Sequence, residues 1–275
     1  MVVQHNLTAA NTNRQLGITT SGLQKSTEKL SSGYKINRAA DDAAGLSISE
    51  KMRNQIRGLN KASDNAQDGI SLVQTAEGAL NEVHSMLQRM SELSVQAANG
   101  TNDTTDRSSI NDEVQQLKTE IQRVSSTTQF NKMNILDGTF SARANKLLQV
   151  GANANQTIQI DIDALQSVVG SSLQGALKTE TATNAQSAIT VVQSSIEKLS
   201  KLRSKLGAVQ NRLEHTVANL DNISENTQSS ESRIRDTDMA EEMVQYSKNN
   251  ILQQAGQSML AQANQANQGV LSLLQ

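Results

Sequence analysis

One unbroken helical pattern constrains this chain more than any other feature of its sequence. Apolar residues recur at spacings of three and four between residues 46 and 98, and no proline occurs among the 275 residues. A helix over that range would be about 80 Å long. A compact globule of the same chain length would have a diameter of only about 50 Å. The sequence therefore predicts an elongated molecule rather than a compact one.

Similar spacing predicts further helices over residues 1–34, 107–126 and 185–227, and from residue 239 to the C-terminus. In the first and last of these, the apolar residues alternate between spacings of four and three, which is the seam pattern of a coiled coil. The predicted seam residues are Leu16, Leu23 and Leu30 in the first helix and Leu252, Met259, Ala263, Ala266, Val270 and Leu273 in the last. We expect these two seams to pair with each other.

Between the helices the pattern changes. Residues 147–162 contain two short alternating runs, which predict a β-hairpin whose buried face carries Ile158, Ile160 and Ile162. Residues 35–47 and 228–238 predict connectors of short turns, and residues 164–185 predict a short linker. The expected fold is mainly α: an elongated antiparallel helical rod or coiled coil with one small β-hairpin and with the N- and C-terminal helices paired.

The composition excludes several classes of protein. Only four residues are aromatic, and Gln and Asn together make up about a fifth of the chain, so the aromatic core usual in globular enzymes is missing. There is no Cys, and hence no disulfide or Cys-based metal site. The formal net charge of −2 argues against a nucleic-acid-binding protein. No run of about 18 apolar residues predicts a transmembrane helix, and residues 1–7 do not resemble a cleaved signal peptide.

Side chains that could carry chemistry are scattered. No metal-ligand spacing relates the three histidines, which are His5, His84 and His215. Asp41 and Asp42 could act as paired carboxylates, but Arg38 precedes them by one helical turn. Capping or pinning of a connector is therefore the simpler interpretation. We expect no catalytic residue, no metal and no cofactor, and hence no enzyme.

Both ends of the chain lack charge. No charged residue follows Lys248, and apart from His5 the first 13 residues are uncharged. A solvent-exposed helix usually carries charges on its outer face. Two interpretations remain open: weakly ordered tails, which are common at chain ends, or helices that several copies of the chain surround. Both can hold in succession if the ends become ordered on assembly.

Five segments resemble bacterial flagellins. The first is residues 30–48, LSSGYKINRAADDAAGLSI, in which the connector motif consists of Asn37, Arg38, Asp41, Asp42 and Gly45. The others are residues 128–138, 147–162, 206–212 and 251–274. The resemblance as a whole extends over nearly the entire chain except about residues 164–185, where many flagellins carry large variable outer domains. The chain resembles a short flagellin without those domains.

The resemblance implies a structural subunit that self-assembles into the helical filament of the bacterial flagellum, for motility. Residues 1–45 and 232–275 would form a terminal coiled-coil domain lining the filament core, and residues 46–231 a rod domain around it. The resemblance also implies unfolded export through the flagellar type III channel, with an export chaperone bound to the C-terminal segment. The filament would be extracellular, and its other partners would be the filament cap and the hook-associated proteins.

Alternatives and one further partner follow from the same segments. A hook–filament junction protein shares the terminal architecture, although the motif in residues 37–48 favours flagellin. A coiled-coil signalling bundle is a different class, for which the sequence offers neither a transmembrane helix nor a partner domain. The resemblance further implies recognition by vertebrate Toll-like receptor 5, because residues 87–96 match the recognised segment. The expected receptor contacts are Arg89, Leu93 and Glu113, and filament packing alone is the other interpretation of these residues.

Overall fold

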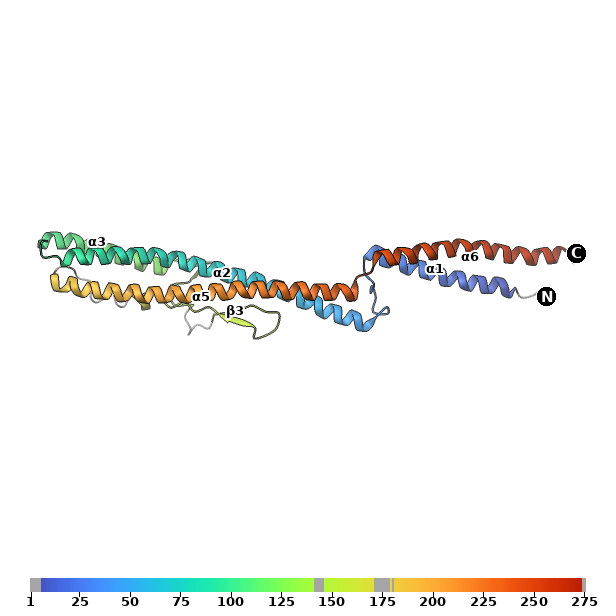
Figure 1. The fold of residues 1–275 in the computed structure, drawn as a ribbon, viewed down its shortest axis with the longest axis horizontal. Helices are drawn as coiled ribbons and strands as arrows, with labels where there is room; N and C mark the ends of the chain where they lie inside the picture. Colours follow the sequence, from blue (N-terminus) through green and yellow to red (C-terminus); the bar gives the residue numbers. More distant parts are fainter. Residues whose placement is uncertain (1–5, 141–145, 171–178, 180, 274–275) are drawn as a thin grey trace. The chain divides into compact units, whose positions relative to one another are not determined.

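The computed structural model describes residues 6–140, 146–170, 179 and 181–273. The described residues form the α-helices α1 (Leu7–Ser32), α2 (Ala43–Ala98), α3 (Thr104–Thr127), α5 (Ala182–Arg235) and α6 (Met239–Leu273) (Figure 1). The chain divides into two compact units. The terminal unit comprises residues 1–54 and 225–275, and the rod unit comprises residues 55–224. Helices α2 and α5 each begin in one unit and end in the other.

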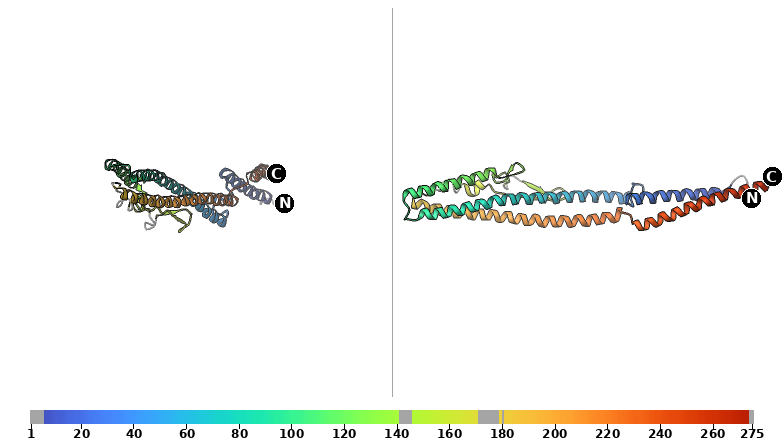
Figure 2. Two further views of the ribbon diagram at one scale, coloured as in Figure 1. Left: turned by 60° about the vertical axis from the view of Figure 1, so that its left-hand side comes forward. Right: turned by 90° about the horizontal axis from the view of Figure 1, so that it is seen from above.

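In the rod unit, α2 and α5 lie side by side and run antiparallel, as the views in Figures 1 and 2 agree. One buried row of α2 has residues seven apart, and α5 buries a matching row. These residues are Leu59, Ala66, Val73, Leu80 and Leu87 in α2, and Val192, Leu199, Leu206, Leu213 and Leu220 in α5. The stripes predicted from sequence are therefore the core. Burial of large apolar side chains at this spacing stabilises long helices that could not persist alone.

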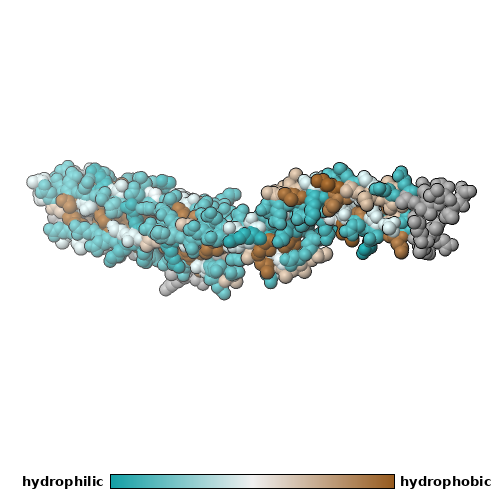
Figure 3. Space-filling view, turned by 45° about the vertical axis from the view of Figure 1, so that its right-hand side comes forward, coloured by the Kyte–Doolittle hydropathy of each residue, from teal (hydrophilic) through white to brown (hydrophobic). Residues whose placement is uncertain are grey.

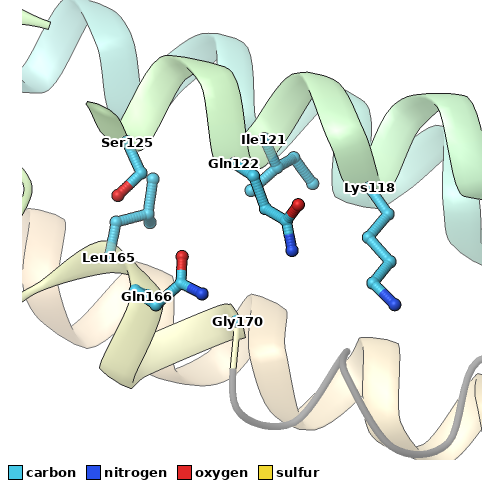
Figure 4. Close-up of a pocket in the computed structure, with 7 residues that line it drawn as sticks. All are labelled: Lys118, Ile121, Gln122, Ser125, Leu165, Gln166 and Gly170. Atoms are coloured by element: carbon cyan, nitrogen blue, oxygen red, sulfur yellow. The ribbon is translucent and has the colours of Figure 1, made fainter. Parts of the chain in front are cut away.

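Helix α3 folds back on α2 after a short turn. The turn contains Asn99 and Gly100, and the backbone N–H of Asp103 donates to Asp106 Oδ2 at 3.3 Å where α3 begins. Ile110, Val114 and Ile121 of α3 are buried against the same core. Helix α3 also meets the short π-helix η2 (Gln166–Gly170), and the two leave a cavity of only about 10 Å³, lined in part by Ile121 (Figure 4). That volume is about enough for one water molecule, so the contact is close.

The described part of the rod unit also contains two small antiparallel strand pairs. Strand β3 (Leu147–Gln149) pairs with β4 (Thr157–Gln159), with Leu148 opposite Ile158. The predicted hairpin is confirmed, with shorter strands, and its expected apolar face is buried: Ile158, Ile160 and Ile162 are at most 4% exposed. A second pair, β1 (Gln129–Phe130) with β2 (Met133–Asn134), was not expected. Asn131 and Lys132 form its turn, both with positive φ.

Two segment predictions need correction. The connector predicted over residues 228–238 is mostly helical, because α5 continues to Arg235 and α6 begins at Met239. The linker predicted over residues 164–185 falls partly outside the described residues. Its described part is not a solvent-exposed linker, since Leu165, Val169 and Thr179 are buried and α5 already begins at Ala182. Residues 164–185 are polar and show no clear periodic pattern, so the structure of their described part depends on tertiary burial.

Candidate assembly surfaces

The terminal helices α1 and α6 pair along rows that mix leucines with small and amide-bearing side chains (Figure 1). The half-buried or buried row of α1 is Ala9, Thr12, Leu16, Thr19, Leu23, Ser26 and Leu30. The corresponding row of α6 is Glu242, Tyr246, Asn249, Gln253, Gly256, Leu260 and Ala263. Both rows alternate between spacings of three and four, so the contact is a short coiled-coil seam. Leu16, Leu23, Leu30 and Ala263 lie on this seam.

Other predicted seam residues of α6 lie elsewhere. Leu252 and Met259 are 47% and 57% exposed, so they are not part of the seam that pairs α6 with α1 in one chain. They line a groove of about 370 Å³ beside that seam, together with Gln15 and Leu16. Helix α6 extends through Ala266, Val270 and Leu273, but these side chains lie outside the described part of the structure.

Apolar side chains remain exposed on several sides of α6. Besides Leu252 and Met259, the helix exposes Met239, Met243, Val244 and Ile251, of which Val244 and Ile251 are about two-thirds exposed. Figure 3 shows brown, apolar areas on the surface of the terminal helices. An isolated surface helix would carry polar residues on these sides. Several exposed apolar rows on one helix indicate contacts with more than one neighbour.

The connector motif shapes the turn between α1 and α2. The Asp41 carboxylate accepts hydrogen bonds from the backbone N–H groups of Arg38 (3.0 Å) and Asn37 (3.3 Å). Asp42 Oδ1 accepts from the backbone N–H of Gly45 (2.9 Å) in the first turn of α2. The Arg38 guanidinium bonds instead to Glu28 of α1, at 2.9 and 3.2 Å. The two aspartates therefore act as pins and caps, which is the simpler interpretation of this pair.

Two further features favour the observed conformation of this connector. A Cβ atom at Gly45 would lie 2.4 Å from Asp42 Oδ2 and 2.8 Å from Ile36 Cδ1, so a larger residue here would displace one or both of these side chains. Hydrogen bonding to the backbone, from Arg38 above all, lowers the pKa of Asp41 below its ordinary value. The ionised carboxylate therefore favours the folded turn above the ordinary pKa of Asp, and this contribution is lost as the pH falls through the lowered pKa.

The expected receptor contacts do not share one surface. Arg89 of α2 bonds to Glu113 of α3 at 2.9 Å, and both side chains are about half exposed. Leu93, one turn further along α2, is 1% exposed and belongs to the core. A partner cannot touch Leu93 while the rod unit is folded, so its assignment as a direct contact is wrong. The heptad phase explains this: Leu93 is next to Ser94 on the face that packs inward, whereas Arg89 points outward.

The described residues contain no group of three or more His, Asp or Glu side chains placed to hold a metal ion. In the same part of the chain, none of the helices is both long and apolar enough to span a bilayer.

Comparisons with known proteins match both helical ends. Residues 3–141 match the bacterial flagellin N-terminal helical region, and residues 189–274 match the bacterial flagellin C-terminal helical region. The chain is 57% identical to a flagellin of Halalkalibacterium halodurans over the full length of both proteins. It is 48% identical to a flagellar filament 31.3 kDa core protein of Treponema maltophilum, again over both full lengths.

A solved structure agrees with these sequence matches. The crystal structure of Bacillus cereus flagellin is 32% identical and superposes with a TM-score of 0.51, covering 57% of this chain and 88% of that one. Two family models that together span both ends, and full-length relatives at about half identity or more, leave one conclusion. The chain belongs to the bacterial flagellin family.

Proposed function

We propose that this flagellin is the structural subunit of a bacterial flagellar filament that lies outside the cell. The observation that supports this most is α6, which pairs with α1 and still exposes Val244, Ile251, Leu252 and Met259 on other sides. Full-length relatives named flagellin and flagellar filament core protein agree with a filament subunit. They also favour this function over the hook–filament junction alternative, which would share the terminal architecture.

Assembly follows from the chemistry of the two ends. Contacts between different faces of identical subunits generate an open helix when the rotation does not close. Ordering the ends costs about 1–2 kcal/mol per backbone residue, so it occurs where neighbouring copies supply burial. Exposed apolar side chains supply that burial, and amides exchange hydrogen bonds between copies without the cost of burying charge. Growth at an existing filament end is therefore favoured over new nucleation.

Seeded growth tests the proposal. Purified full-length chain is mixed with fragmented filaments of the same protein and followed by sedimentation and electron microscopy. We expect filaments to lengthen from the seeds, with little assembly in their absence. A chain that stays in the supernatant over seeds of its own filaments would contradict the proposed function.

Further partners belong to the same proposal. We propose that the chain leaves the cell unfolded through the flagellar export channel, with an export chaperone on its C-terminal segment, and meets the filament cap and hook-associated proteins at the filament ends. The absence of Cys suits passage as an unfolded chain, because no disulfide can form before export.

We also propose that the exposed Arg89–Glu113 pair contacts Toll-like receptor 5 of a vertebrate host. Arg89→Ala should reduce signalling by the monomer without lowering its melting temperature, because exposed ion pairs contribute little to stability. Arg123→Ala removes another exposed ion pair, with Glu120 on α3, and is the matched control that should signal normally. Equal signalling by both variants would contradict the contact.

Leu93→Ala separates receptor contact from rod stability. This change removes a core side chain and should lower the free energy of unfolding by about 2–5 kcal/mol. Any loss of signalling by Leu93→Ala should therefore be accompanied by a lower melting temperature in circular dichroism.

A further inference from the structure

The two connectors of the terminal unit pair with each other, a contact that the sequence analysis did not predict. The backbone N–H of Lys35 donates to the carbonyl of Arg235 at 2.7 Å, and the N–H of Thr237 donates to the carbonyl of Gly33 at 3.0 Å. Tyr34 and Asp236 face each other in this short antiparallel pairing. Residues 33–35 follow α1, and residues 235–237 begin at the last residue of α5 and continue toward α6. The pairing therefore connects the C-terminal end of α1 to the N-terminal end of α6, and we call it the joint.

The side chain of Arg235 stabilises this joint. The guanidinium of Arg235 lies over the ring of Tyr34, with Cζ 4.7 Å from the ring centroid. Its Nη1 atom is 3.0 Å from Glu50 Oε1 on α2, and the Arg235 side chain is only 14% exposed. Arg235 thus links the end of α5, the residue after the C-cap of α1, and the beginning of α2. Lysine would keep the charge but could not stack a planar guanidinium on Tyr34 while bonding to Glu50.

The pairs further along α1 and α6 continue the alignment set at this joint. Lys29 forms an ion pair with Glu242 at 3.3 Å. About one heptad further out, a Cβ on Gly22 would lie 3.2 Å from Asn249 Nδ2. About one heptad beyond that, a Cβ on Gly256 would lie 3.2 Å from Leu16 Cδ1. Steps of nearly equal length on the two helices keep the same antiparallel register throughout.

The helical seam itself specifies this register weakly. Small residues such as Thr19, Ser26 and Gly256 lie between the larger Leu16, Leu23 and Leu30, and a seam of such mixed sizes has fewer large knobs to lock one axial position over a neighbouring one. In coiled coils, single polar contacts often decide the register that apolar packing leaves open. The joint at Arg235 is such a contact, since it fixes one pair of residues at the base of both helices.

We infer that Arg235 is the positioning residue that sets the register of α1 against α6, and thereby aligns the exposed rows of α6 for contact with neighbouring subunits. The inference rests on the proposed assembly function. It assigns Arg235, Tyr34 and Glu50 a shared task in assembly, distinct from that of the seam residues.

Disulfide trapping reads the register directly, because the chain has no Cys of its own. Full-length protein carrying Gly22→Cys and Asn249→Cys reports the observed register. Protein carrying Gly22→Cys and Gln253→Cys reports a shift of one turn. Both pairs are assembled on seeds and oxidised, with Arg235 intact or changed to Ala. With Arg235 intact, we expect the first pair alone to cross-link efficiently. With Arg235→Ala, the shifted pair should cross-link as well, and seeded growth should slow by about tenfold.

Three controls make the result decisive. Arg233→Ala, in the same last turn of α5 but with an exposed side chain, should leave both register and growth unchanged. Arg235→Lys keeps the charge without the stacked fork and should fall between wild type and Arg235→Ala. If Arg235→Ala lowers the rod melting temperature, Tyr34→Leu and Glu50→Gln remove the two contacts separately, and each should release the shifted register. Arg235→Ala filaments that cross-link only at 22–249 would overturn the inference, whereas wild-type protein that fails to grow on seeds would instead overturn the proposed function.

Discussion

Deletion of residues 250–275 should abolish seeded filament growth while the rod unit stays folded. The deletion removes most of the α6 row that pairs with α1, including Gly256, which lies against Leu16. It also removes the carbonyl of Ala263, to which the Asn6 side chain donates a hydrogen bond at 3.0 Å. The exposed Ile251, Leu252 and Met259 go with it, so neighbouring subunits lose the apolar surface that repays the ordering of the ends.

The deletion of residues 250–275 removes none of the contacts that stabilise the rod unit. Its core clusters are built from residues between Leu59 and Leu220, and stability there comes from packing within the rod. Circular dichroism of the truncated chain should show a cooperative melt close to that of the full-length monomer. The full-length chain carrying Gln116→Asp, an added charge on the exposed face of α3, is the control and should melt and polymerise normally. Normal filaments from the truncated chain would mean that the neutral ends are dispensable.

A single added charge should act in the same direction. Ala263 lies on the α1-facing row, so Ala263→Asp would place an unpaired carboxylate in the seam and should slow seeded growth. The same change at Ala266 is expected to weaken assembly as well.

The long helices could be predicted because their apolar period runs for many turns without proline. Each buried row of α2 and α5 appears in the sequence as a stripe, and packing of one stripe on the other needs no information beyond the period. The hairpin face at Ile158, Ile160 and Ile162 could be predicted for the same reason, since strict alternation has only one buried side. These features depend on residues close together in the sequence.

The face of α6 that packs against α1 could not be predicted in this way. Its largest apolar residues, such as Leu252 and Met259, mark a stripe that a monomer seam would use, yet Asn249, Gln253 and Gly256 face α1 instead. A helix with apolar residues on several sides has no single preferred face, and only its neighbours determine which row turns inward. The joint of Tyr34, Glu50 and Arg235 could not be predicted from the sequence either. These residues belong to three separate segments, which come into contact only in the tertiary structure.

Helix ends and weakly patterned segments depended on tertiary contacts as well. Residues 228–235 are polar and charged, which suggests a connector, but Ser232, Ile234 and Arg235 are half-buried and α5 remains helical to its contact with Glu50. The turn of the unexpected β1–β2 pair carried a local signal in Asn131, since Asn tolerates positive φ better than most residues. No other feature of the sequence indicated that the chain turns between Phe130 and Met133 to form this strand pair.

Ile160→Asp should destabilise the rod unit more than any surface change. Ile160 follows β4, donates its backbone N–H to the carbonyl of Lys146 at 3.3 Å, and is 4% exposed within the main core. Its Cδ1 atom faces Gly69 of α2, where an added Cβ would lie 3.7 Å away. An aspartate here would bury an unpaired carboxylate and leave a gap where Ile160 packed, at a cost of several kcal/mol.

The melting temperature of the rod measures this cost. For a unit of this size, each kcal/mol lost lowers the melting temperature by about 2–4 °C, so Ile160→Asp should lower it by about 10 °C. Gln159→Asp adds the same charge one residue earlier, on the exposed side of the strand, and should leave the melt nearly unchanged. The difference between the two variants isolates burial from charge, because strand position and added carboxylate are matched. Equal melting temperatures for the two would mean that the Ile158–Ile162 face is solvated, and that the hairpin contributes nothing to the core of the rod.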